Sequence, residues 1–166
     1  MKYLLFAIPL FFSFTCFSEF IDKSGGDSIR MVISLPKAAV ESENDLILTL
    51  MVRTTRSTPL EIPKQGLWSY VNSGPGFFFI EVQRKRNGKF VDVPGNARID
   101  NVPIADIDTL KGNEMRKFIT SMRLLFHYTK GQYRVRVLGA FSTLNNSHDI
   151  YSNWVYFNCE HEIVIN

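Results

Sequence analysis

The stretch Gly131-Gln132-Tyr133-Arg134-Val135-Arg136-Val137 decides the fold class of this chain. Residues 133, 135 and 137 are apolar or aromatic and fall on one face of an extended chain, while the two arginines between them fall on the other. Strict alternation of this kind predicts a half-buried β-strand. The strand opens with Gly-x-Tyr.

The first eighteen residues have the layout of a secretory signal peptide. A basic start at Met1-Lys2 precedes an almost wholly apolar run over residues 3–14, and small residues follow that run. The run is shorter than a membrane-spanning helix, which needs about 20 residues. We therefore expect export to the periplasm, the cell surface or the medium. Residues 19–27 are a polar lead-in, and residues 28–166 are long enough for one domain.

The two cysteines leave the processing of the N-terminus open. Cys16 follows the apolar run and is preceded by Ser13-Phe14-Thr15, which is similar to a loose bacterial lipoprotein box, so it would carry lipid and anchor the chain to a membrane. A cut after Ser18 would remove it instead. In both cases Cys159 has no partner in the mature chain. Because Cys159 lies in an alternating stretch, we expect a buried thiol and no disulfide.

The composition describes a globular domain rather than a disordered or nucleic-acid-binding chain. Hydrophobic residues make up 45% of the sequence, which is enough for a real core. The formal net charge is only +3, and no concentrated basic face is evident, so nucleic acid is not an expected partner. Contact with a membrane is expected only through the lipid anchor at Cys16.

Alternating stretches separated by turn residues predict about seven strands. Asn87-Gly88 lies between two of them and is a strong hairpin signal, because both residues tolerate positive φ. No stretch has a long helical period, and only residues 124–128 suggest a single helical turn. The expected strands are residues 28–35, 46–53, 77–85, 89–93, 115–124, 133–138 and 149–159, with short extended pieces at 59–63 and 162–165. This pattern predicts an all-β antiparallel sandwich.

Several motifs in this order carry a resemblance to a known family. Asn44-Asp45-Leu46 leads into the second strand, Leu110-Lys111-Gly112-Asn113-Glu114 precedes the strand at residue 115, and Tyr151-Ser152-Asn153-Trp154-Val155-Tyr156-Phe157 follows the stretch at residue 131. Together they resemble bacterial exported immunoglobulin-like domains, which occur alone or beside proteases and other surface enzymes.

The resemblance implies an immunoglobulin-like antiparallel β-sandwich of about seven strands, in which Gly131, Tyr133 and Val135 form a structural corner. It also implies a scaffold or binding module at the cell envelope, with no catalytic residues to transfer. The chain departs from antibody-type domains, because Val135 stands where one cysteine of the disulfide would be and no tryptophan is evident on the third strand.

Residues that could carry catalysis or hold a metal are scattered. His127, His148 and His161 form no pair at metal-ligand spacing, and no nucleophile or phosphate-loop motif is present. Asp100 and Asp106-Ile107-Asp108 could line a calcium site, but the full ligand set is absent, so a solvated loop is expected. The sequence therefore predicts no enzyme, no cofactor and no metal.

The candidate binding residues lie in the long predicted loop over residues 64–76. Trp68 and Tyr70 are residue types that anchor interfaces or stack on sugars, so we expect them to bind a protein or a glycan. Alternatively, Trp68 folds down and closes the open end of the core. A protease inhibitor or protease-associated module of the same fold is the alternative function. The basic hairpin tip at residues 84–89 is expected to be a solvated surface that deters strand pairing, rather than a site for an anionic surface.

Overall fold

The computed structural model describes residues 28–56, 59–64, 68–70, 78–95, 107–123, 125–143 and 146–163, the side chains of residues 68–70, 142–143 and 146–148 excepted. Over these residues the chain is all-β, as the sequence predicts, with one short 3-10 helix, η1 (Glu43–Asp45). The predicted signal peptide and lead-in, residues 1–27, lie outside the described residues. The strands are β1 (Ile29–Ser34), β2 (Ala39–Val40), β3 (Ile47–Thr54), β4 (Leu60–Pro63), β5 (Trp68–Tyr70), β6 (Phe78–Arg86), β7 (Lys89–Asp92), β8 (Ile107–Leu110), β9 (Met115–Ser121), β10 (Gly131–Thr143), β11 (Asn146–Tyr151) and β12 (Val155–Cys159).

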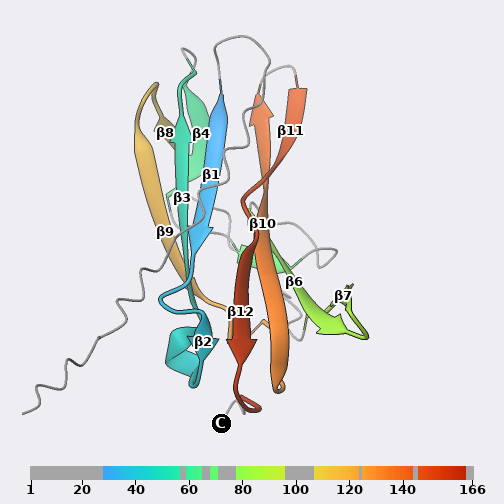
Figure 1. The fold of residues 1–166 in the computed structure, drawn as a ribbon. Coiled ribbons are helices and arrows are strands. Elements are labelled where there is room, and N and C mark those ends of the chain that lie inside the picture. The colour runs from blue at the N-terminus through green and yellow to red at the C-terminus, as the bar shows by residue number, and fades with distance from the viewer. Residues whose placement is uncertain are drawn as a thin grey trace, which may run out of the picture.

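The strands form three sheets (Figure 1). The three-stranded sheet has the order β1-β3-β9, and all of its pairs are antiparallel. The seven-stranded sheet has the order β2-β12-β10-β6-β5, with β11 also paired to β10 and β7 also paired to β6. Two of its pairs, β2 with β12 and β5 with β6, are parallel. The third sheet is the antiparallel pair β4 and β8.

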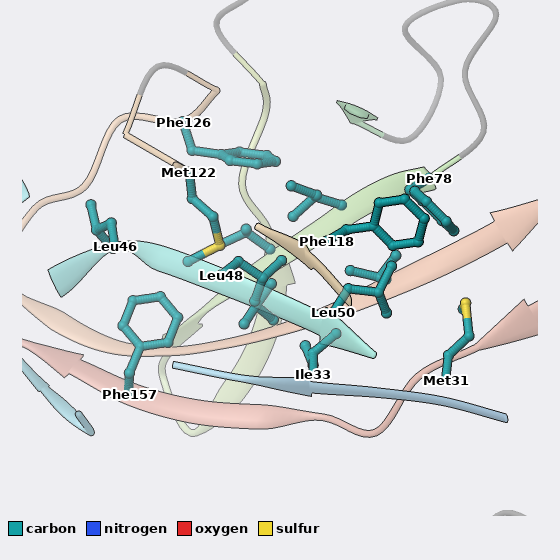
Figure 2. Close-up of a cluster of buried hydrophobic side chains, with 14 of the residues drawn as sticks. Met31, Ile33, Leu46, Leu48, Leu50, Phe78, Phe118, Met122, Phe126 and Phe157 are labelled. Carbon is teal, nitrogen blue, oxygen red and sulfur yellow. The ribbon is translucent and has the colours of Figure 1, made fainter. Parts of the chain in front are cut away.

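The two larger sheets share one hydrophobic core, because each buries one face of alternating apolar residues. On β3 the buried positions are Leu48, Leu50 and Val52, and the residues between them are only partly buried. Figure 2 shows where the sheets meet: Phe78 of β6 packs on Phe118 of β9, with ring centroids 5.0 Å apart. Burial of these side chains is the main force that holds the sheets together.

The hairpin predicted at Asn87-Gly88 is confirmed. Strand β6 pairs antiparallel with β7 on either side of it, and Asn87 and Gly88 have φ angles of 51° and 80°. Positive φ at both central residues is the conformation of a two-residue turn whose twist matches that of the flanking strands.

The prediction of one closing strand over residues 149–159 is wrong, because the structure has two strands there, β11 and β12. Leu138 pairs with Tyr151 and Val135 pairs with Val155, so residues 152–154 face only residues 136–137 of β10. This one-residue bulge reverses the alternation, and both Tyr151 and Tyr156 consequently lie on the outer face of the sheet.

Two side chains hold this bulge in place. The Val137 amide donates to Ser152 Oγ at 2.9 Å, and the Ser152 amide donates to the Val137 carbonyl at 2.8 Å. Asn153 reaches the other sheet: its Oδ1 accepts from the Ile33 amide at 2.8 Å, and its Nδ2 donates to the Ile33 carbonyl at 3.2 Å. The segment between β11 and β12 therefore ties strand β10 of one sheet to strand β1 of the other.

The strand predicted over residues 115–124 ends earlier, at Ser121, and no helical turn forms at residues 125–128. The Met122 amide donates to the Leu46 carbonyl, and the Leu125 amide donates to the Met122 carbonyl, which makes a turn at this point. Phe126 and Tyr128 then form isolated bridges to Gly95 and Ile163, so the chain runs extended. Leu124 lies outside the described residues.

The count of about seven strands is too low for the part of the chain that the structure describes, which has twelve. The additional strands are short ones within predicted loops or at sheet edges, such as β2, β5 and β8. They are held by pairing with partners distant in the sequence rather than by their own residue pattern, and tertiary pairing of this kind overrides local propensity.

Candidate functional site

The residues of the predicted corner come together at the start of β10. Tyr133 is buried, and its hydroxyl donates to the Thr129 carbonyl at 2.8 Å and accepts from the Thr129 amide at 3.0 Å. Gly131 has a φ of 155°, and a Cβ atom at this position would lie 3.0 Å from Arg84 Nε, so a glycine here lets the guanidinium group pack closely. Val135 is fully buried.

Replacing Tyr133 with phenylalanine is expected to lower the free energy of unfolding by about 1–3 kcal/mol, because the partly buried amide and carbonyl of Thr129 would lose their partner. The matched control is Tyr128→Phe. Tyr128 is as deeply buried and its ring lies 5.5 Å from that of Tyr133, but its hydroxyl has no hydrogen-bond partner within the described residues. Urea titrations should therefore find the control neutral or stabilising, and equal losses in both variants would contradict the corner assignment.

A stack of aromatic rings and guanidinium groups covers the outer face of the seven-stranded sheet. The Arg134 guanidinium lies between Phe90 and Trp154, at 4.4 and 4.2 Å from their ring centroids. The Arg136 guanidinium lies between Trp154 and Tyr151, at 4.5 and 4.0 Å. We call this stack, with the edge-on ring of Tyr156 against Phe90, the aromatic ladder: Tyr156, Phe90, Arg134, Trp154, Arg136 and Tyr151.

The ladder forms because the register of four strands places its members side by side. The alternation of β10 directs both arginines outward, opposite the buried valines of the same strand. Phe90 comes from β7 across the hairpin, Tyr151 from the end of β11, Trp154 from the bulged segment and Tyr156 from β12. Both guanidinium groups lie within about 6 Å of ring faces, where their positive charge is attracted to the quadrupole of the ring.

Hydrogen bonds from the neighbouring strand β6 fix the two arginines. Arg134 Nε donates to Gln83 Oε1 at 2.8 Å, and Arg136 Nε donates to Glu81 Oε2 at 2.7 Å. The Gln83 amide in turn donates to Glu81 and to Asp92, at 2.9 and 2.8 Å. The side chains of the ladder are thus ordered before any partner arrives, which lowers the entropy lost on binding.

The outermost members of the ladder are open to solvent. Tyr151 and Tyr156 are 45% and 56% exposed. Aromatic residues and arginine are the types enriched in the cores of protein interfaces. The ladder therefore offers an apolar surface with two fixed cations, and its arrangement suits non-covalent binding.

Sequence analysis did not single out the ladder, although its signal is visible there. The arginines were assigned to the outer face of their strand, and the aromatic residues at 151, 154 and 156 were noted only as part of the last strand. Aromatic residues on one strand and arginines at the outward positions of its neighbour are the pattern that predicts such a stack.

The predicted binding residues Trp68 and Tyr70 lie in strand β5 and not in a loop, which corrects the prediction for part of residues 64–76. Strand β5 runs parallel to β6, with Trp68 opposite Phe78 and Tyr70 opposite Ile80. Their side chains and residues 71–77 lie outside the described part of the chain. Binding through these two residues stays a prediction.

The basic hairpin tip has a partly structural role. Arg84 Nη2 donates to the Lys130 carbonyl at 2.7 Å, and its guanidinium lies 5.8 Å from the ring centroid of Tyr133. Arg84 therefore packs against the corner, while Lys85, Arg86 and Lys89 are exposed.

The predicted loop carboxylates are only partly described. Asp108 lies in strand β8, not in a loop, and its Oδ2 accepts from Arg116 Nη2 at 2.8 Å. This hydrogen bond, with a second one from the Thr109 amide, lowers the pKa of Asp108. Asp100 and Asp106 lie outside the described residues.

The candidate metal ligands and the two cysteines are described only in part. His127 Nε2 lies 3.1 Å from Glu162 Oε1 on the surface, and no group of three metal-ligating side chains gathers within the described ranges. Cys159 is a free, buried thiol, as predicted, and burial raises its pKa to about 12. Cys16, the predicted lipid anchor, lies outside the described residues.

No protein-family model matches this chain, and no curated protein matches it by sequence. Among the described residues, no helix has the length and apolar character needed to cross a bilayer.

Proposed function

We propose that this chain is an exported immunoglobulin-like β-sandwich that acts, without catalysis, as a binding module for a protein partner at the cell envelope. The sheet orders support the fold: β1-β3-β9 faces a sheet containing β12-β10-β6-β7, and the tyrosine corner opens the strand β10 next to the last strand of that sheet. The layout of the first eighteen residues supports export.

The aromatic ladder is the observation that carries the binding proposal. Its rings are rigid and apolar, they border two fixed cations, and the tyrosines at its ends are about half exposed. Monomeric proteins rarely leave contiguous apolar surface open without an interaction that uses it.

The stacking favours a protein over a glycan as the partner. A sugar stacks on the open face of an aromatic ring. Both faces of Trp154 are covered by guanidinium groups, and one face each of Phe90 and Tyr151 is covered in the same way. Trp154 therefore offers only its edge, which suits close packing against apolar side chains of a protein.

The test is affinity capture from an envelope extract of the native cells on matched columns. One carries the unaltered chain, one carries Tyr151→Ala with Tyr156→Ala, one carries Trp68→Ala with Tyr70→Ala, and a control carries Met115→Ala with Ile119→Ala from the other sheet. Loss of two aromatic anchors should weaken the affinity for the captured protein by roughly a thousandfold, about 30-fold for each, since an anchor of this type contributes about 2 kcal/mol or more.

The four columns separate the possible sites. Retention of one protein on the control column and its loss on the Tyr151 and Tyr156 column would support the ladder. Loss on the Trp68 and Tyr70 column alone would move the site to β5, and equal retention on every column would refute both locations. A captured species released by free sugar would overturn the preference for a protein partner.

A further inference from the structure

The outer face of the three-stranded sheet has a charge pattern unlike that of the other sheet. Arg30 of β1, Arg53 of β3 and Lys117 of β9 occupy outward positions between the buried ones. Arg30 pairs with Arg53 across the sheet, and Lys117 pairs with Met51 in the neighbouring strand pair. No outward position of these three described strands carries an acidic residue, so Arg53 and Lys117 lie on a face that has no carboxylate of its own.

Apolar side chains lie among these cations. Met115 and Ile119 of β9 are 61% and 59% exposed, among the most exposed large apolar residues in the described part of the chain. Met115 pairs with Arg53 and Met51 pairs with Lys117, so these two cations each border an apolar neighbour. We call this surface the basic face: Arg30, Met51, Arg53, Met115, Lys117 and Ile119.

We propose that the basic face docks on an anionic lipid surface. Lysine and arginine near such a surface are attracted to its headgroups, and exposed aliphatic side chains can enter the boundary between headgroups and acyl chains. The long side chains of Arg53 and Lys117 can keep their charges at the headgroups while Met115 and Ile119 insert. This site is separate from the aromatic ladder and does not depend on the proposed protein partner.

The composition of the face argues against the other occupants. A second copy of the chain would bring the same three cations against one another, and like charges in contact oppose association. Arginine and methionine also occur in protein interfaces, but the aromatic residues that are enriched there are absent from the outward positions of these three strands, and lysine, present here at position 117, is depleted in such interfaces. On the seven-stranded sheet, by contrast, Glu81 and Asp92 accompany the arginines and the rings.

The two larger sheets bury their inner faces in one core, so their outer faces point in different directions. A domain docked through the basic face would leave the aromatic ladder accessible from the side away from the lipid. The same module could then hold a protein partner close to a membrane without competition between the two surfaces.

The experiment is co-sedimentation of the full-length chain with vesicles of phosphatidylcholine alone and with vesicles of equal parts phosphatidylcholine and phosphatidylglycerol. The apolar N-terminal residues contribute equally to every variant, so the measured quantity is the additional binding caused by phosphatidylglycerol. Arg53→Glu with Lys117→Glu should reduce this additional affinity by roughly 25-fold, about fivefold for each cation lost. Salt at about 0.5 M should abolish it, because the Debye length then falls below about 5 Å.

The matched control is Lys85→Glu with Lys89→Glu on the exposed hairpin, which changes the net charge by the same amount. If this control keeps the additional binding and the Arg53 and Lys117 variant loses it, the proposal is supported. Equal loss in both variants would show an effect of net charge alone and would overturn the docking face, as would unchanged binding in both. Circular dichroism confirms that each variant is folded, and the exposed positions of the substitutions make that the expected result.

A variant of the apolar residues provides a second measurement. Met115→Ser with Ile119→Ser should weaken binding to the phosphatidylglycerol vesicles severalfold without changing its dependence on salt, because the cations remain. Unchanged affinity in this variant would contradict insertion of the two side chains.

Discussion

Replacing Phe78 with alanine is expected to lower the free energy of unfolding by about 3–5 kcal/mol, the range for truncating a fully buried phenylalanine. Phe78 has no exposed surface, and its ring packs on Phe118 of the other sheet and on Phe141 of its own sheet, at centroid distances of 5.0 and 6.3 Å. The loss would therefore remove contacts within a sheet and between the sheets. Chemical denaturation of the unaltered chain and the variant measures it.

The neighbouring residue provides the control for this substitution. Phe79 follows Phe78 on the same strand, points to the opposite face and is only partly buried. Its replacement by alanine should cost less than about 1.5 kcal/mol, because less apolar area leaves the interior. If the two variants lost equal stability, the two larger sheets would not share the core around Phe78.

Cys159 is expected to react with a thiol reagent at pH 8 roughly a thousandfold more slowly in the folded protein than in the unfolded chain. Burial raises its pKa from 9.0 to about 12, which reduces the reactive thiolate by this factor, and the side chain is also shielded from the reagent. Cys16→Ser removes the other thiol, so that iodoacetamide labelling followed by mass spectrometry reports on Cys159 alone. Rapid labelling of the folded chain would show that the thiol is accessible.

The raised pKa also determines how stability depends on alkaline pH. The folded state holds the Cys159 proton more tightly than the unfolded state, so the stabilisation is fully present below pH 9 and is lost as pH rises from 9 towards 12. Burial raises the pKa of Tyr128 as well, which adds to the loss in the same direction. In thermal melts above pH 9, Cys159→Ala should show a shallower decline than the unaltered chain, and identical slopes would contradict this origin.

The elements that sequence analysis predicted best are those whose residues alternate. Strand β3 has apolar residues at every second position, and burial of that face in a core leaves only one register. The Asn87-Gly88 hairpin was predictable for a different reason, since only a few residue types adopt its backbone conformation.

The elements that were missed depend on partners distant in the sequence. Strand β5 has three residues and pairs parallel with β6, and nothing in Trp68-Ser69-Tyr70 distinguishes a strand from a loop. The break between β11 and β12 depends on bonds from Ser152 to Val137 and from Asn153 to Ile33, which are 15 and 120 residues away. A local pattern does not contain such contacts, so one continuous strand was the natural prediction.

The candidate site was predictable only in its parts. The outward direction of Arg134 follows from the alternation of its strand, but its position between Phe90 and Trp154 depends on the register of β7 and on a bulge. The ladder requires four strands to be in register at once, and register between distant strands is set by the tertiary structure.

The amide side chain of Asn153 has a consequence for the solubility of the protein. Its Oδ1 and Nδ2 make with the backbone of Ile33 the two hydrogen bonds that a neighbouring strand would otherwise make there. An open strand edge is a template for pairing with another molecule and for growth into aggregates. By occupying this position on β1 with its own side chain, the chain blocks one route to intermolecular sheet extension, and it does so without adding a charged residue to the strand.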